Sequence, residues 1–130
     1  MFVDIQLKVN IKESAMLAHL VFINNTDETL YLDTKTICTH GQTRRNIFNI
    51  VDENNDKVKY TGIMEKRFVV PEDFIPIDSG DKIETNIKLN EVYKVNRGVK
   101  YSIQFSVYHP SYNEKQGINK MESNIVEVVY

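Results

Sequence analysis

The chain lacks tryptophan altogether and holds only one cysteine and three prolines in 130 residues. The single Cys38 excludes an internal disulfide and fits a reducing compartment. No apolar run approaches the roughly 20 residues that a membrane-spanning helix needs. Asp4, Gln6 and Lys8 interrupt the region where the apolar core of a signal peptide would lie. Together these absences predict a cytoplasmic protein that makes no use of a membrane.

Surplus positive charge is also absent, because Lys and Arg number 16 against 18 Asp and Glu. A surface that follows nucleic-acid phosphates needs clustered positive charge. The pairs Arg44-Arg45 and Lys66-Arg67 are too short to provide it, so the sequence predicts no nucleic-acid partner. A length of 130 residues fits one compact domain, which we expect to span residues 1–130.

Branched apolar residues are what the chain has in abundance, since Val and Ile number 28 against six Leu and two Ala. Branching at Cβ suits a pleated sheet better than a helix. Residues 3–10, 83–89 and 99–108 alternate between apolar and polar, which is typical of strands with one solvent-exposed face. The run from Met16 to Ile23 is dense enough for burial on both faces. The turn residues that follow it favour a strand over a helix.

Turn residues and prolines divide the rest of the chain into short segments. A hairpin is expected from Ile47 to Tyr60, because the Asn and Asp residues at its centre tolerate positive φ. Pro71 and Pro76 predict an edge strand or an extended crossing between them. Residues 34–46 and 109–121 are polar and predict long loops. The pattern predicts an all-β fold, an immunoglobulin-like antiparallel β-sandwich of about seven to nine strands.

Residues that could carry catalytic or metal chemistry are few and poorly spaced. None of the three histidines has a second ligand at metal-binding spacing, and no pair of cysteines exists for a zinc site. Cys38 and His40 resemble a nucleophile and base, but no third group is present to orient the base. The glycines stand singly at turn positions rather than in a phosphate-binding loop. The sequence therefore predicts a non-catalytic protein that uses no metal or cofactor.

The stretch from residue 47 to residue 80 carries the most specific pattern in the chain. Its elements are Phe48-x-Ile50, Val58-x-Tyr60-x-Gly62, Lys66-Arg67, Asp73-Phe74-Ile75 and Ser79-Gly80. This pattern resembles the N-terminal β-sandwich domain that precedes the catalytic domain in deuterolysin-like (aspzincin) metallopeptidases, including the peptidyl-lysine type. The similarity extends over roughly residues 15–130, with further matches at Asn24-x-Thr26, Leu89-x-x-x-Tyr93 and Glu122-Ser123-Asn124.

The resemblance has consequences for activity and partner. In that family the zinc ligands and the catalytic Glu lie in a following domain that has no counterpart in these residues, so we expect no peptidase activity from them. The resemblance implies a propeptide-like domain that inhibits a zinc metallopeptidase or helps it to fold. Lys66 and Arg67 match the family pattern and are candidate contacts to that partner. A structural alternative is that Arg67 pairs with Asp73 while Phe74 fills the core.

Two hypotheses of function follow, and both concern binding. In the first, the chain is a protein-binding module whose loops form the contact surface. Tyr108, His109 and Tyr112 are then candidate anchors, because aromatic side chains are enriched in binding hot spots. The alternative is a structural or assembly protein, a homodimer for example, that associates through exposed strand edges or loops. An enzyme ranks last, since no nucleophile, base and orienting group converge in the sequence.

Overall fold

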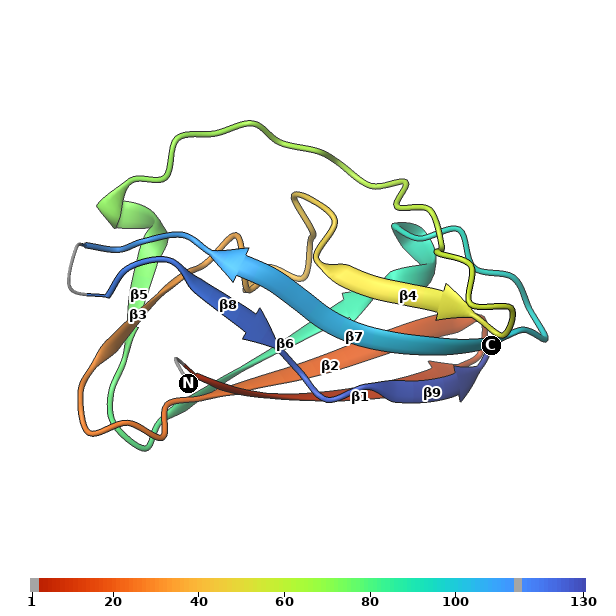
Figure 1. Cartoon of the computed structure of the whole chain (residues 1–130), viewed down its shortest axis with the longest axis horizontal. Helices are drawn as coiled ribbons and strands as arrows, with labels where there is room; N and C mark the ends of the chain where they lie inside the picture. The colour runs from red at the N-terminus through yellow and green to blue at the C-terminus, as the bar shows by residue number, and fades with distance from the viewer. Residues whose placement is uncertain (1–2, 114–115) are drawn as a thin grey trace.

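The computed structural model describes residues 3–113 and 116–130, and within them the chain forms nine strands that pair only antiparallel. Two sheets pack face to face with the core between them (Figure 1). The first sheet has the order β1 (Asp4–Lys12), β2 (Ala15–Ile23) and β6 (Lys82–Lys88). Its three strands correspond to the alternating or dense apolar segments expected near residues 3–10, 16–23 and 83–89.

The second sheet is built on β7 (Lys100–His109), the longest strand of the chain. β4 (Phe48–Asp52) pairs with one edge of β7. β8 (Asn119–Glu122) and β9 (Val126–Val129) follow one another along the opposite edge. The fold prediction is therefore confirmed, because the described chain is an all-β antiparallel sandwich with a strand number inside the expected range.

A two-stranded ribbon lies beside the sandwich and supports one end of it. β3 (Leu30–Asp33) pairs with β5 (Phe74–Ile77), and η1 (Pro71–Asp73) leads into β5. A second short helical turn, η2 (Leu89–Glu91), follows β6. The expectation of an edge strand near the prolines is confirmed, since within the described residues β5 pairs with β3 alone and Pro76 stands within it.

The dense apolar run of β2 has the two-residue burial period of a strand rather than that of a helix. Met16, Ala18, Leu20 and Phe22 alternate along one face and are wholly buried between the sheets. The residues between them are half-buried, so the expectation of burial on both faces was wrong. They lie beside polar residues of β1 and β6 on the outer face, for example His19 next to a Lys and an Asn.

Aromatic side chains from both sheets join at the centre of the core. Phe105 of β7 meets Phe22 of β2 and Phe48 of β4 edge to face, at centroid distances of 5.6 and 5.7 Å. Tyr93 also packs on Phe48, and its hydroxyl accepts the Phe48 N–H at 2.9 Å and donates to Asn46 Oδ1 at 2.6 Å. The buried Tyr93 therefore has its polar atom satisfied, as a core tyrosine requires.

Two local expectations were wrong. Residues 109–121 are not one loop, because His109 ends β7 and β8 begins at Asn119. The outgoing half of the hairpin near Tyr60 is not a strand, although isolated bridges join Val51 to Lys57 and Tyr60 to Tyr93.

In the part of the chain that the structure describes, no helix is long and apolar enough to cross a membrane.

Several strand edges are occupied by other parts of the same chain. The side-chain amide of Asn124 accepts the Leu7 N–H at 2.7 Å and donates to the Leu7 carbonyl at 3.0 Å, which closes that point of β1. The side-chain amide of Gln116 likewise accepts the N–H of Tyr31 in β3 at 3.1 Å and donates to the Tyr31 carbonyl at 2.8 Å. Residues 56–58 hydrogen-bond to the outer edge of β4. These contacts satisfy backbone groups that an added strand would need.

Candidate protein-binding site

Residues 61–70 form an extended segment, here called the strap, that crosses the outside of the molecule from the β4 side to η1 (Figure 1). No strand or helix is assigned within this range. The Thr61 N–H donates to the Val92 carbonyl at 2.7 Å, and the Val70 carbonyl accepts the Asp73 N–H at 3.0 Å. The main chain thus holds the strap to the body at Thr61, and at Val70 the strap passes directly into η1.

The strap exposes five large apolar side chains, and Phe68 is 95% exposed. The others are Ile63, Met64, Val69 and Val70. Single exposed apolar residues are ordinary, but a contiguous group of them marks an interaction site in a folded protein. Phe68, Val69 and Val70, which follow one another in the sequence, therefore lie at the surface.

Two ion pairs hold the strap against the body between its ends. Glu65 pairs with Arg44 at 3.1 Å, and the Glu65 N–H also donates to the Arg44 carbonyl at 2.8 Å. Arg67 inserts between two carboxylates, donating from Nη1 to Asp73 at 2.8 Å and from Nη2 to Asp33. The Asp33 side chain is 0% exposed, so it depends on Arg67 for compensation of its charge.

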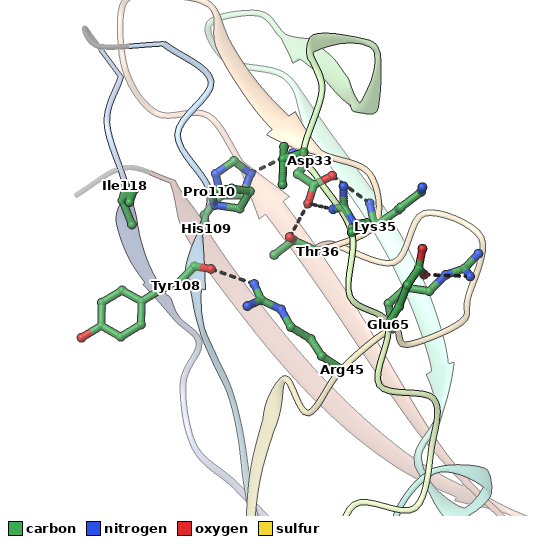
Figure 2. A pocket seen from close by; sticks show the side chains of 12 residues that line it. Asp33, Lys35, Thr36, Arg45, Glu65, Tyr108, His109, Pro110 and Ile118 are labelled. Atoms are coloured by element: carbon green, nitrogen blue, oxygen red, sulfur yellow. Dashed lines mark hydrogen bonds and ion pairs between the residues drawn. The ribbon is translucent and has the colours of Figure 1, made fainter.

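Asp33 is the centre of a hydrogen-bond network below the strap. Its carboxylate accepts from the Thr36 hydroxyl at 2.5 Å, and its backbone N–H donates to Nε2 of His109 at 2.8 Å (Figure 2). An Nε2 that accepts a hydrogen bond carries no proton. Burial lowers the pKa of His109 to about 4, although Asp33 opposes this shift, so the ring is neutral near pH 7.

A cleft of about 290 Å³ lies between the strap and the end of β7. Arg67 and Val69 line it from the strap, and Tyr108 and His109 from β7. Ile118, just before β8, completes the far side, and the Tyr108 ring points outward at the rim (Figure 2). The cleft thus places Val69 of the strap opposite Ile118 and Tyr108 of the second sheet.

Basic groups outnumber acidic ones in this cleft. Four basic and two acidic side chains line it, and both acids, Asp33 and Glu65, are already paired with arginines. Arg45 donates from Nη2 to the Tyr108 carbonyl at 2.8 Å. Among the described residues no carboxylate lies within ion-pair distance of Arg45. The cleft therefore has net positive charge in a chain whose net charge is −2.

The structure brings three of the five predicted binding residues to this cleft. Arg67, Tyr108 and His109 line it, although His109 is buried and belongs to the network that supports the wall. Lys66 is exposed on the strap. Tyr112 stacks on Tyr31 at 4.1 Å and does not line the cleft.

The alternative expectation for Arg67 is confirmed as a structural fact. Arg67 pairs with Asp73, and the neighbouring Phe74 is buried. The addition that the sequence did not predict is Asp33, which shares the same guanidinium. Arg67 therefore anchors the strap, and its guanidinium is engaged within the chain.

The Cys38 and His40 pair does not converge on a site. The Cys38 thiol is buried, and burial raises its pKa to about 12, while His40 is exposed. A thiol with a raised pKa is a poor nucleophile near neutral pH. Among the residues that the structure describes, no group of three His, Cys, Asp or Glu is placed to hold a metal ion.

Arg45 and Phe68 are the residues of this site that sequence reasoning missed. Arg45 stood in a pair too short to indicate a basic surface, and Phe68 stood in an apolar patch of the kind that usually enters the core. The one available signal was that residues 63–70 combine apolar side chains with no alternation.

Comparison with models of protein families and with curated protein sequences found no match to this chain.

Proposed function

We propose that this chain is a protein-binding module that contacts its partner through the apolar side chains of the strap. The observation that carries the proposal is the near-complete exposure of Phe68 on a segment anchored by the buried Arg67–Asp33 ion pair. Aromatic anchors dominate binding energy when a partner buries them. A segment already held in place loses less conformational entropy on binding than a free loop.

The strap is better suited to this role than the edges of β1, β3 and β4. Its backbone is extended, and an extended segment can add to the edge of a partner's sheet. By contrast, β1, β3 and β4 have edge groups bonded to other parts of the chain. Assembly through those edges, the alternative function, would require these hydrogen bonds to break first.

A partner class follows from the sequence resemblance alone, namely a zinc metallopeptidase that this domain inhibits or helps to fold. Titration of the purified protein into a lysine-specific aspzincin peptidase tests that class. We expect loss of peptidase activity as the protein is added. Unchanged activity at micromolar excess would remove the peptidase from the proposal and leave the strap as a contact surface for another protein.

Affinity purification from the native cell tests the wider proposal. Phe68→Asp places a charge where the partner would bury an aromatic ring, so we expect it to abolish recovery of the wild-type partner. Ile125→Asp is the matched control, because Ile125 is also exposed but lies between β8 and β9. Equal recovery by wild type and Phe68→Asp would show that the strap is not the contact surface.

A further inference from the structure

The cleft beside the strap has a charge pattern that specifies its ligand. We infer that it takes an acidic segment of the partner protein, in which a carboxylate stands next to an apolar side chain. This inference rests on the proposed function and adds the chemistry of the partner to it. The carboxylate contacts Arg45, and the apolar side chain contacts Val69, Tyr108 and Ile118.

The acidic groups of the cleft are already paired with arginines, so they have no spare charge to attract a cation. Glu65 is paired with Arg44 at 3.1 Å, and Asp33 is paired with Arg67. Asp73, just behind them, accepts from Arg67 at 2.8 Å and lies 3.8 Å from Lys35 Nζ. The charge left over is positive and belongs to Arg45 and, in part, to Lys35.

Arg45 is held in position and still has donors available for a ligand. One of its nitrogens donates to the main-chain carbonyl of Tyr108 at 2.8 Å, which holds the guanidinium at the wall of the cleft (Figure 2). A guanidinium has five N–H donors in a planar fork, so donors remain for a carboxylate. Lys120 adds a second cation at the same rim, with Nζ 4.5 Å from the centre of the Tyr108 ring.

Apolar side chains lie around these cations. Tyr108 is 62% exposed and Ile118 is 70% exposed, and Val69 of the strap faces the same cleft. The cleft is small for a drug-sized ligand, since such sites hold roughly 300–1,000 Å³, and its volume is about 290 Å³. Its size suits a side chain or two of a peptide that continues along the strap.

The small number of surplus cations in the cleft favours a peptide over a nucleic acid as its ligand. Nucleic-acid affinity comes from many phosphate contacts made together. Here the surplus cations are few, and the whole chain carries a net charge of −2. An acidic peptide needs only one well-placed arginine, because a charge-assisted Arg–carboxylate contact is short and directional.

Peptide titration tests the inference directly. The probes are a fluorescent peptide that alternates Asp and Leu and its isostere that alternates Asn and Leu, followed by fluorescence anisotropy. We expect the Asp peptide to bind about tenfold more tightly, with an advantage that shrinks as salt is raised. Equal affinities for the two peptides would overturn the inference.

Matched variants locate the effect. Arg45→Gln should remove the preference for the Asp peptide, whereas Arg97→Gln, which deletes the same charge outside the cleft, should keep it. If both variants lost the preference for the Asp peptide equally, the attraction would come from overall charge. That result would overturn the inference that the cleft binds the peptide. A single-stranded oligonucleotide that displaces the peptide from wild type but not from Arg45→Gln would assign the cleft to nucleic acid, which also overturns it.

The failure of this inference is separable from failure of the proposed function. If recovery of the native partner depends on Phe68 but the peptides bind equally, the binding function stands and the acidic partner does not. If recovery of the native partner does not depend on Phe68 while binding of the Asp peptide still requires Arg45, the strap is not the contact surface. The inference that the cleft binds an acidic peptide then remains.

Discussion

Phe105 and Phe68 have the same side chain but lie in opposite environments. Phe105, on β7, is 0% exposed and meets two other aromatic rings in the core, whereas Phe68, on the strap, is 95% exposed. The core is held by apolar contact between two sheets. The strap is held by hydrogen bonds and by ion pairs through Glu65 and Arg67. Apolar residues therefore stabilise one region and, in the other, are left available for a partner.

The largest effect is expected from Phe105→Ala in the core. Removing a fully buried Phe side chain costs roughly 3–5 kcal/mol in free energy of unfolding, because burial is lost and a cavity remains. Urea denaturation measures the change. A loss below about 1 kcal/mol would mean that this aromatic cluster is not the centre of the core.

Arg67→Ala should have the next largest effect, although it removes no residue of the central core. It leaves the Asp33 carboxylate buried without compensation, and breaking a buried pair in this way costs roughly 3–5 kcal/mol. We expect the lower end of that range, since Thr36 still donates to Asp33. Arg44→Ala is the control, because its half-exposed pair with Glu65 should cost at most about 1 kcal/mol.

Acidification should weaken the support below the strap through His109. Its pKa in the folded protein is lowered to about 4 from an ordinary value of 6.5, mainly by burial. The unfolded chain therefore binds more protons between these values, so the stabilising contribution is complete above about pH 6.5 and is lost as pH falls through 4. Asp33 raises this pKa and Arg45 lowers it, and both remain near the ring.

The size of this pH effect is at most about 3 kcal/mol. Urea denaturation between pH 7 and pH 5 avoids most of the titration of carboxylates. His109→Gln keeps an acceptor for the Asp33 N–H and should flatten the slope of stability against pH in that interval. An unchanged slope in His109→Gln would contradict the assignment of His109 as the titrating group.

Phe68→Ala should have the smallest effect on stability and so completes the comparison. A side chain that is 95% exposed has little burial to lose, so the substitution should change the free energy of unfolding by less than about 0.5 kcal/mol. The same urea denaturation used for Phe105→Ala measures it. A loss of several kcal/mol would mean that Phe68 packs on the body in solution.

Much of the sandwich was predictable because alternation reports which face of a strand is buried. The buried set Tyr101, Ile103, Phe105 and Val107 of β7 is the alternating set of the sequence. β8 was missed because Met121 is its only buried residue, which is too little for a periodic signal.

The site was harder to predict because its parts are distant in the sequence. The pairing of Arg67 with Asp73 was foreseen, since they are only six positions apart in the sequence. Asp33 lies 34 residues before Arg67, and its role depends on how β3 lies beside β5. Exposure of Phe68 also follows from tertiary structure, since an apolar patch has the same local sequence whether it is buried or exposed.

Photocrosslinking at position 68 tests the central claim most directly. A photoreactive phenylalanine analogue replaces Phe68 in the full chain in the native cell, and the same analogue replaces Ile125 as a control. The account predicts a discrete crosslinked adduct from position 68 that is absent from position 125. Adducts of equal yield at both positions, or none at position 68, would contradict the claim that the strap is the contact surface.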